Sequence, residues 1–188
     1  MSELELITLT LSLVLGLSIA QLLSAVALAF RTRRDRRMHW IPLCWATAIF
    51  LLHVQFWFVV YDLDSIVPAW TWDWYGPVLL LAVLLFLSGA LILPTRDRDL
   101  AVGLLDDFDV HGKYALVPIS VYLLMFIPMN VRMGNSWFAL VNIPDVILGV
   151  LAAVAFLTKK PGARAVSTLL YLAVTAWAVF FLWSKPGA

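Results

Sequence analysis

Six long apolar segments, separated by short polar stretches, divide the chain from end to end. They cover roughly residues 6–30, 41–61, 78–93, 114–131, 138–157 and 168–183. They are apolar on every side, without the alternation of a β-strand, and most approach the length of about 17–25 residues that crosses hydrocarbon. Because hydrocarbon offers no partner to open backbone amides, such segments must be helices. The pattern predicts an all-α fold, a polytopic integral membrane protein in which residues 1–188 form one bundle of six transmembrane helices.

Composition supports a membrane protein rather than a soluble one. Of the 188 residues, 63% are hydrophobic and only 13% are charged, and the mean hydropathy is +0.93. A soluble domain is about half apolar and about a quarter charged. The first apolar segment follows an acidic leader and is longer than the apolar region of a signal peptide, so we expect it to be retained.

Basic residues are distributed very unevenly among the connections. Eleven of the thirteen Lys and Arg residues lie in residues 31–40, 94–113 and 158–167, and the other two are Arg132 and Lys185. Basic loops remain on the cytoplasmic side of a membrane. We therefore expect these three connections in the cytoplasm and both termini outside it, in a multi-pass protein of the inner (plasma) membrane of a bacterium.

The connection over residues 62–77 combines aromatic and acidic side chains and has no basic residue. Aromatic rings at a membrane boundary usually form an interfacial belt. The alternative is an aromatic lip over a cavity on the outer side. The residues concerned are Asp62, Asp64, Trp70, Trp72, Asp73, Trp74 and Tyr75.

The connection over residues 95–113 contains a candidate amphipathic helix and a group of polar donors. Leu100, Leu104, Leu105 and Phe108 fall on one helical face, which predicts a short helix lying on the membrane. Carboxylate and imidazole groups could bind a divalent metal, although we favour a solvated acidic loop and expect no cofactor. The candidate ligands are Asp106, Asp107, Asp109 and His111.

Small residues recur at every fourth position of the first segment. Such a row gives a smooth helix face that lets another backbone approach closely. The spacing predicts a helix-packing face, toward either the same chain or another one, made of Thr8, Ser12, Gly16, Ala20 and Ser24.

Polar groups inside apolar segments are costly in hydrocarbon and are the best pointers to function. A rise of about 1.5 Å per residue places His53, Gln55, Asn142 and Asp145 in one layer in the outer half of the membrane. We predict that His53 and Asp145 point into the bundle and interact. Pro144, just before Asp145, is expected to free a backbone carbonyl that could contribute to an ion site. The alternative is that these groups are buried only for packing.

No sequence motif of a soluble enzyme, a phosphate loop, a haem site or a nucleic-acid interface is present. The sequence therefore favours a non-enzymatic membrane subunit, scaffold or sensor that packs with other membrane helices, in a homo-oligomer or with another membrane protein. The alternative is a small transporter or channel that uses the layer around His53 and Asp145, with its two halves in opposite orientation. A lipid-modifying enzyme is third, because no nucleophile or metal cluster can be identified.

Overall fold

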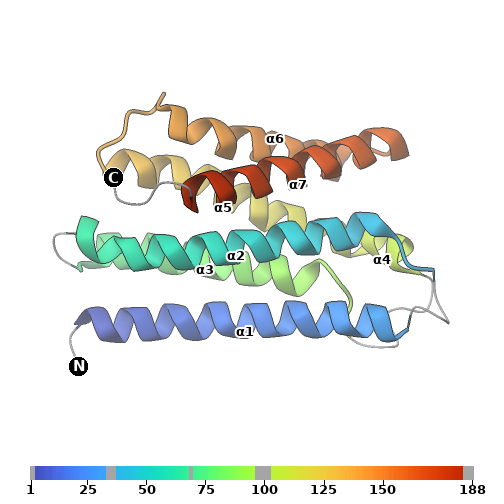
Figure 1. Cartoon of the computed structure of the whole chain (residues 1–188), viewed down its shortest axis with the longest axis horizontal. Helices are drawn as coiled ribbons and strands as arrows, with labels where there is room; N and C mark the ends of the chain where they lie inside the picture. The colour runs from blue at the N-terminus through green and yellow to red at the C-terminus, as the bar shows by residue number, and fades with distance from the viewer. Residues whose placement is uncertain (1–2, 33–36, 68–69, 96–102, 184–188) are drawn as a thin grey trace.

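The computed structural model describes residues 3–32, 37–67, 70–95 and 103–183, and its regular structure there is entirely helical (Figure 1). The seven α-helices of this part are α1 (Glu3–Arg31), α2 (Trp40–Ile66), α3 (Trp72–Leu91), α4 (Leu104–Val110), α5 (Leu116–Arg132), α6 (Ile143–Leu157) and α7 (Pro161–Trp183). Short 3-10 helices, η2 (Gly112–Ala115) and η3 (Leu140–Asn142), precede α5 and α6. Six helical stretches are long and apolar enough to cross a membrane: α1, α2, α3, α5 together with η2, α6 together with η3, and α7. The predicted helical class and the six long apolar helices are thus confirmed.

Several helix ends lie outside the apolar segments that predicted them. Helix α3 begins at Trp72 and not near Val78, because residues of the aromatic connection form its first turn. Helix α7 begins at Pro161, well before the predicted Thr168. Proline is favoured at the first position of a helix, where its missing N–H has no partner to lose. Hydropathy detects the part of a helix that suits hydrocarbon and does not detect its polar extensions.

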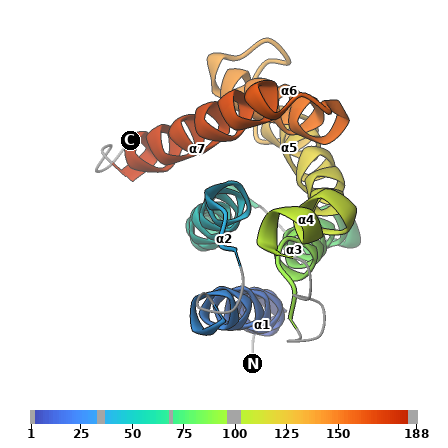
Figure 2. The same ribbon diagram turned by 90° about the vertical axis from the view of Figure 1, so that its right-hand side faces the viewer.

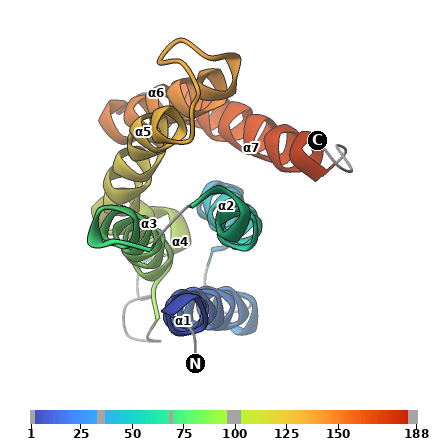
Figure 3. The same ribbon diagram turned by 90° about the vertical axis from the view of Figure 1, so that its left-hand side faces the viewer.

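The six long helices form a ring in the order α1, α3, α5, α6, α7, α2, in which each packs on its two neighbours. Helices α1 to α3 lie on one side of the ring and α5 to α7 on the other (Figures 2 and 3). Helix α1 packs mainly on α3, whereas α5 and α7 both pack on α6. Inverted repeats would have the same packing pattern in both halves. The two halves of this bundle have different patterns.

Aromatic side chains fill the middle of the ring. The Trp45 ring on α2 lies 4.4 Å from the Tyr171 ring on α7, measured between centroids, and both side chains are buried. The Trp45 indole N–H also donates a hydrogen bond to the Thr168 hydroxyl at 3.0 Å. About three turns further along α2, Phe56 meets Tyr122 of α5 edge to face. These contacts join the two halves of the bundle through α2.

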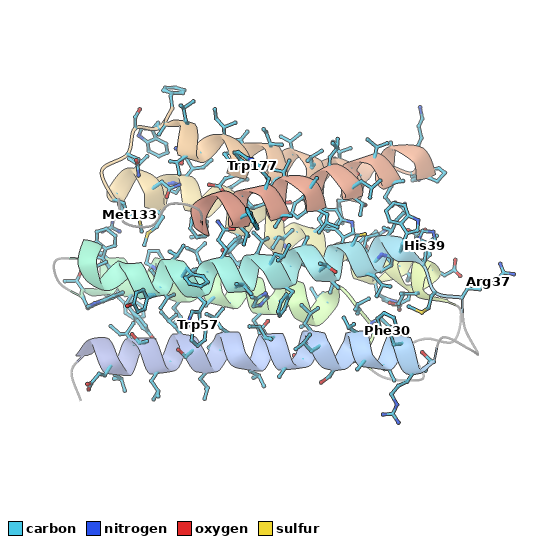
Figure 4. The ribbon with its side chains drawn as sticks, viewed as in Figure 1. Phe30, Arg37, His39, Trp57, Met133 and Trp177 are labelled. Atoms are coloured by element: carbon cyan, nitrogen blue, oxygen red, sulfur yellow. The ribbon has the colours of Figure 1, made fainter. Side chains whose placement is uncertain are left out.

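The two ends of the bundle differ in charge. We call the end at which α1 finishes and α2 begins the basic end, and the opposite end the far end. Phe30, Arg37 and His39 lie at the basic end, and Met133 lies at the far end (Figure 4). Helix α4 also lies at the basic end (Figure 1).

Helix α4 confirms the prediction of a short amphipathic helix between the third and fourth long helices. Leu104 and Phe108 are buried against the bundle, Leu105 is half-buried, and Leu100 lies outside the described residues. The helix packs on α2 and η2, so its apolar face covers the bundle and is not free to lie on lipid.

Candidate functional site

His53 lies in the middle of α2 and is completely buried. Its Nδ1 is 2.8 Å from the Ile49 carbonyl oxygen one turn earlier, and its Nε2 is 2.6 Å from the Ser18 hydroxyl of α1. A carbonyl can only accept, so Nδ1 carries the proton and donates it to Ile49. In the neutral tautomer with this proton on Nδ1, the Ser18 hydroxyl donates to the lone pair of Nε2. Both ring nitrogens thus have a hydrogen-bond partner.

Gly89 of α3 completes this contact between three helices. A Cβ atom at Gly89 would lie 3.1 Å from Ser18 Oγ and 3.6 Å from His53 Cε1. A side chain at this position would make the Ser18 hydroxyl, which bonds to His53, shift by a few tenths of an ångström. We call Ser18, His53 and Gly89 the three-helix node, since they join α1, α2 and α3.

The three-helix node has the same pair of groups as a serine nucleophile with its histidine base, but it lacks access to a substrate. A hydroxyl that donates to an oriented imidazole is the arrangement that activates serine in hydrolases. However, Ser18 and His53 are each at most 1% exposed, and Gly89 closes the third side. A substrate has no access to the hydroxyl, so the node is a structural contact.

The structure does not form the expected pair of His53 and Asp145. Both ring nitrogens of His53 are engaged by Ser18 and Ile49. Asp145 lies on α6, which packs on α5 and α7. The polar layer therefore consists of separate groups, with His53 at the three-helix node and Asp145 in the second half of the bundle.

The other two members of the predicted layer have different surroundings. Asn142 accepts a hydrogen bond from the Asn130 amide at 2.8 Å and donates to the carbonyls of Ser136 and Trp137. These hydrogen bonds hold the connection before α6, which contains Ser136 and Trp137, against the end of α5. Gln55 is half-buried on α2.

Pro144 does not free a carbonyl in the way that the sequence predicted. It is the second residue of α6. The first turn of a helix has unpaired N–H groups in any case, so a proline there breaks no helical hydrogen bond. The expected break inside a longer helix is wrong, because α6 begins at Ile143.

Asp145 faces two buried tyrosines on neighbouring helices. Its carboxylate, in the first turn of α6, interacts electrostatically with Tyr122 of α5 and Tyr171 of α7. Both tyrosines are buried, as is Thr175, one turn after Tyr171 on the same face of α7. The hydroxyls of Tyr171 and Thr175 have no hydrogen-bond partner among the described residues. The tyrosines were not predicted, because the candidates taken from the sequence were the carboxylate, imidazole and amide groups inside the apolar segments.

The small-residue row of α1 faces away from the rest of the chain. Thr8, Gly16, Ala20 and Ser24 are exposed and Ser12 is half-buried. A Cβ atom at Gly16 would meet nothing within 4 Å. Within the described residues, α1 packs on its neighbours through a different face, which includes Leu11, Leu15, Ser18 and Leu22. A partner for the small-residue row would have to come from another molecule.

The aromatic connection borders a pocket of about 310 Å³ at the far end, between the start of α1 and the start of α3. Its lining is Leu6, Ile7, Thr10, Trp70, Thr71, Trp72 and Tyr75. Nearby, the Arg132 guanidinium stacks over the Trp74 ring at 4.7 Å and donates to the Asp73 carbonyl at 2.6 Å. This contact ties the end of α5 to the start of α3.

The candidate metal ligands around α4 have other partners. Asp109 forms an ion pair with Arg164 of α7, and Asp107 lies 3.3 Å from the His111 ring, while Asp106 is exposed. In the described part of the chain, no three such side chains come together as a metal site would require. The Asp109 carboxylate is engaged in a charge-assisted hydrogen bond from Arg164. Asp109 thus attaches α4 to α7.

Comparison of the chain with models of protein families, with curated proteins and with solved structures finds no match.

Proposed function

We propose that this protein is a non-enzymatic, multi-pass membrane subunit that associates with a second copy of itself through the outward face of α1. One observation carries the proposal: a row of small residues, spaced for close helix contact, has no partner within the described part of the chain. A Cβ atom at Gly16 would have no neighbour within 4 Å among the described residues apart from the backbone of its own helix. Small residues at four-residue spacing are the usual interface where transmembrane helices cross closely.

A second copy fits this face because the face is complementary to itself. Leu9, Leu13 and Leu17 form the adjacent row on α1 and are 59–72% exposed. The leucine row is a ridge and the small-residue row is a groove, and helices pack by placing ridges into grooves. Two copies inserted in one membrane have parallel α1 helices, so each ridge can enter the other's groove around a two-fold axis.

The same proposal includes the orientation of the chain. With six membrane crossings, the three basic connections lie on one side and both termini lie on the other. The positive-inside rule assigns the basic end to the cytoplasm. The bilayer is then the inner (plasma) membrane of a bacterium, and the aromatic connection forms the interfacial belt on the outer surface.

Topology reporters test the orientation. Fusions after Arg37, Arg98 and Lys160 should be active in a cytoplasmic assay, and fusions at Asp64 and Gly187 in an assay for the outside. The reason is the concentration of eleven of thirteen basic residues in alternate connections. A C-terminal fusion that reports from the cytoplasm would contradict an even number of crossings.

Self-association is tested by energy transfer between two differently labelled populations of the full chain, diluted stepwise in lipid vesicles. Gly16→Leu and Ala20→Leu should each weaken the dimer at least about tenfold, equivalent to about 1.4 kcal/mol, because a large side chain separates the backbones. Ala173→Leu, which changes an exposed alanine on α7 in the same way, is the matched control.

The Gly16 change is informative because it should leave the isolated fold intact. No atom of the described chain lies within reach of a new Cβ there. Unfolding of the Gly16→Leu protein should therefore match that of the parent in dilute micelles. A chain that is monomeric throughout the dilution series, or a Gly16→Leu variant that associates normally, would overturn the proposal.

A transporter or channel that uses a layer around His53 and Asp145 has less support. His53 is enclosed by Ser18, Ile49 and Gly89, and its ring offers no free nitrogen to a passing ion. The remaining polar group, around Asp145, is argued separately below.

A further inference from the structure

Asp145 is an unpaired carboxylate inside one of the apolar helical stretches. It belongs to the stretch Leu140–Leu157, which is long and apolar enough to cross a membrane. Among the described residues it has no ion pair and no hydrogen bond, and it is only half-buried. The nearest basic residue along the chain, Arg132, is engaged by Asp73 and Trp74. A charged carboxylate in such surroundings needs a compensating group.

Of the two tyrosines that face Asp145, Tyr171 has an unsatisfied hydroxyl, and so has Thr175 one turn after it on α7. Tyr122 and Tyr171 interact electrostatically with the carboxylate, yet neither hydroxyl is hydrogen-bonded to it. The Tyr171 hydroxyl and the Thr175 hydroxyl are buried, and no acceptor or donor within the described residues reaches them. Buried polar atoms almost always have a partner, so two orphaned hydroxyls on one face of α7, one of them in electrostatic contact with an unpaired carboxylate, point to a missing bound species.

The positions of these residues along their helices agree with one site. Helix α6 starts at the far end, and Asp145 lies in its first turn. Helix α7 runs toward the far end, so Thr175 lies about 6 Å closer to that end than Tyr171 does. The two unsatisfied hydroxyls of α7 lie one turn apart on one face of the helix, and Tyr171 is the one that interacts electrostatically with Asp145.

The chemistry of the group restricts the ligand. The donors are carboxylate and hydroxyl oxygens, which prefer hard cations, and no thiol or imidazole is among them. One carboxylate supplies at most one negative charge, and the positive end of α6 offsets part of it. A divalent cation would retain a large uncompensated charge there, whereas a monovalent cation would leave the site close to neutral.

We propose that Asp145, Tyr122, Tyr171 and Thr175 form an intramembrane binding site for a monovalent inorganic cation, with Na⁺ as the ion that best suits small oxygen ligands. The cation lies between α6 and α7 and bridges the carboxylate to the two orphaned hydroxyls. Its charge replaces the salt bridge that Asp145 lacks. The site is independent of the α1 interface, so either proposal can fail alone.

Thermal unfolding of the purified full chain in mild detergent tests the site. The midpoint should rise with NaCl concentration to a plateau, at constant ionic strength made up with choline chloride, because a ligand of the folded state stabilises it. Choline, which is too large for such a site, should give no rise. A smaller rise in KCl than in NaCl is expected from the preference for a small ion.

Variants separate this site from a general salt effect. Asp145→Asn should abolish the Na⁺-dependent rise, and Tyr171→Phe and Thr175→Val should each weaken Na⁺ binding about tenfold. Thr47→Val is the matched control, because Thr47 is exposed on α2 and its hydroxyl bonds only to the Leu43 carbonyl of its own helix. This control should retain the full response.

Binding of radioactive Na⁺ to the parent protein gives a second measurement that needs no variant. Saturable binding of one ion per chain, weakened about tenfold in Tyr171→Phe even if Asp145→Asn fails to fold, supports the site. Equal unfolding midpoints in NaCl and choline chloride, or an Asp145→Asn variant that still binds Na⁺, would overturn it. In that case ordered water alone satisfies the hydroxyls.

Discussion

Replacing Trp45 with alanine is expected to lower the free energy of unfolding by about 3 kcal/mol. Trp45 is among the largest fully buried side chains, at 1% exposed. Its ring fills the space between α2 and α7, 4.4 Å from the Tyr171 ring, and its N–H bonds to Thr168. Alanine would leave a cavity where the two halves of the bundle meet. This value is at the lower end of the usual cost of replacing a buried tryptophan with alanine. The reason is that apolar side chains gain little from burial when the alternative is contact with lipid.

Two further variants divide this loss into its parts. Trp45→Phe keeps most of the ring volume and removes the donor, so it should cost about 1 kcal/mol. Trp57→Ala changes a tryptophan of the same helix that is 47% exposed, and it should cost less than Trp45→Ala by at least about 1 kcal/mol. Unfolding by increasing mole fractions of dodecyl sulfate in mixed micelles, followed by circular dichroism, measures all three. Equal losses for the Trp45→Ala and Trp57→Ala variants would show that the α2–α7 contact contributes little.

The six long helices could be predicted because hydropathy averaged over about twenty residues is a strong signal. Their order around the ring could not. A segment that is apolar on every side, such as residues 78–91 of α3, does not show which face meets protein and which meets lipid. The packing of α1 illustrates this, because its row of small residues gave the right periodicity and the wrong face for contacts within the chain.

The partner of His53 was missed for a related reason. The prediction rested on how deep each residue lies along its helix. Depth does not show which face of the helix a side chain is on or which helix that face meets. Ser18 lies at the centre of the first apolar segment, residues 6–30, and therefore at nearly the depth of His53. Serine was overlooked because its hydroxyl usually bonds to its own helix, as Ser24 bonds to Ala20 and Ser88 to Leu84. Candidate partners of a buried histidine should include every hydroxyl at its depth.

Valine substitutions at two glycines are expected to have opposite effects on folding and association. Gly89→Val should destabilise the fold by about 1–3 kcal/mol, because extra atoms must enter a filled space. A Cβ atom there already lies 3.1 Å from Ser18 Oγ and 3.9 Å from the Ser18 carbonyl oxygen. The backbone of α1 cannot move away without loss of the hydrogen bond between Ser18 and His53. Gly16→Val meets no atom of the chain within 4 Å of its Cβ and should change the free energy of unfolding by less than about 0.5 kcal/mol.

Measured together, the two valine variants separate contacts within the chain from contacts between chains. Unfolding in mixed micelles should show a loss of stability for Gly89→Val and none for Gly16→Val. Energy transfer between copies in vesicles should show a weaker dimer for Gly16→Val. The cause of the Gly89 effect is tested with Gly89→Ala and Ser18→Ala, alone and combined. Ser18→Ala removes the nearest atom, so the double variant should be more stable than the sum of the two single losses predicts, by at least about 0.5 kcal/mol. Additive losses would mean that Gly89 is required by the approach of the α1 and α3 backbones, and not by the hydroxyl that bonds to His53.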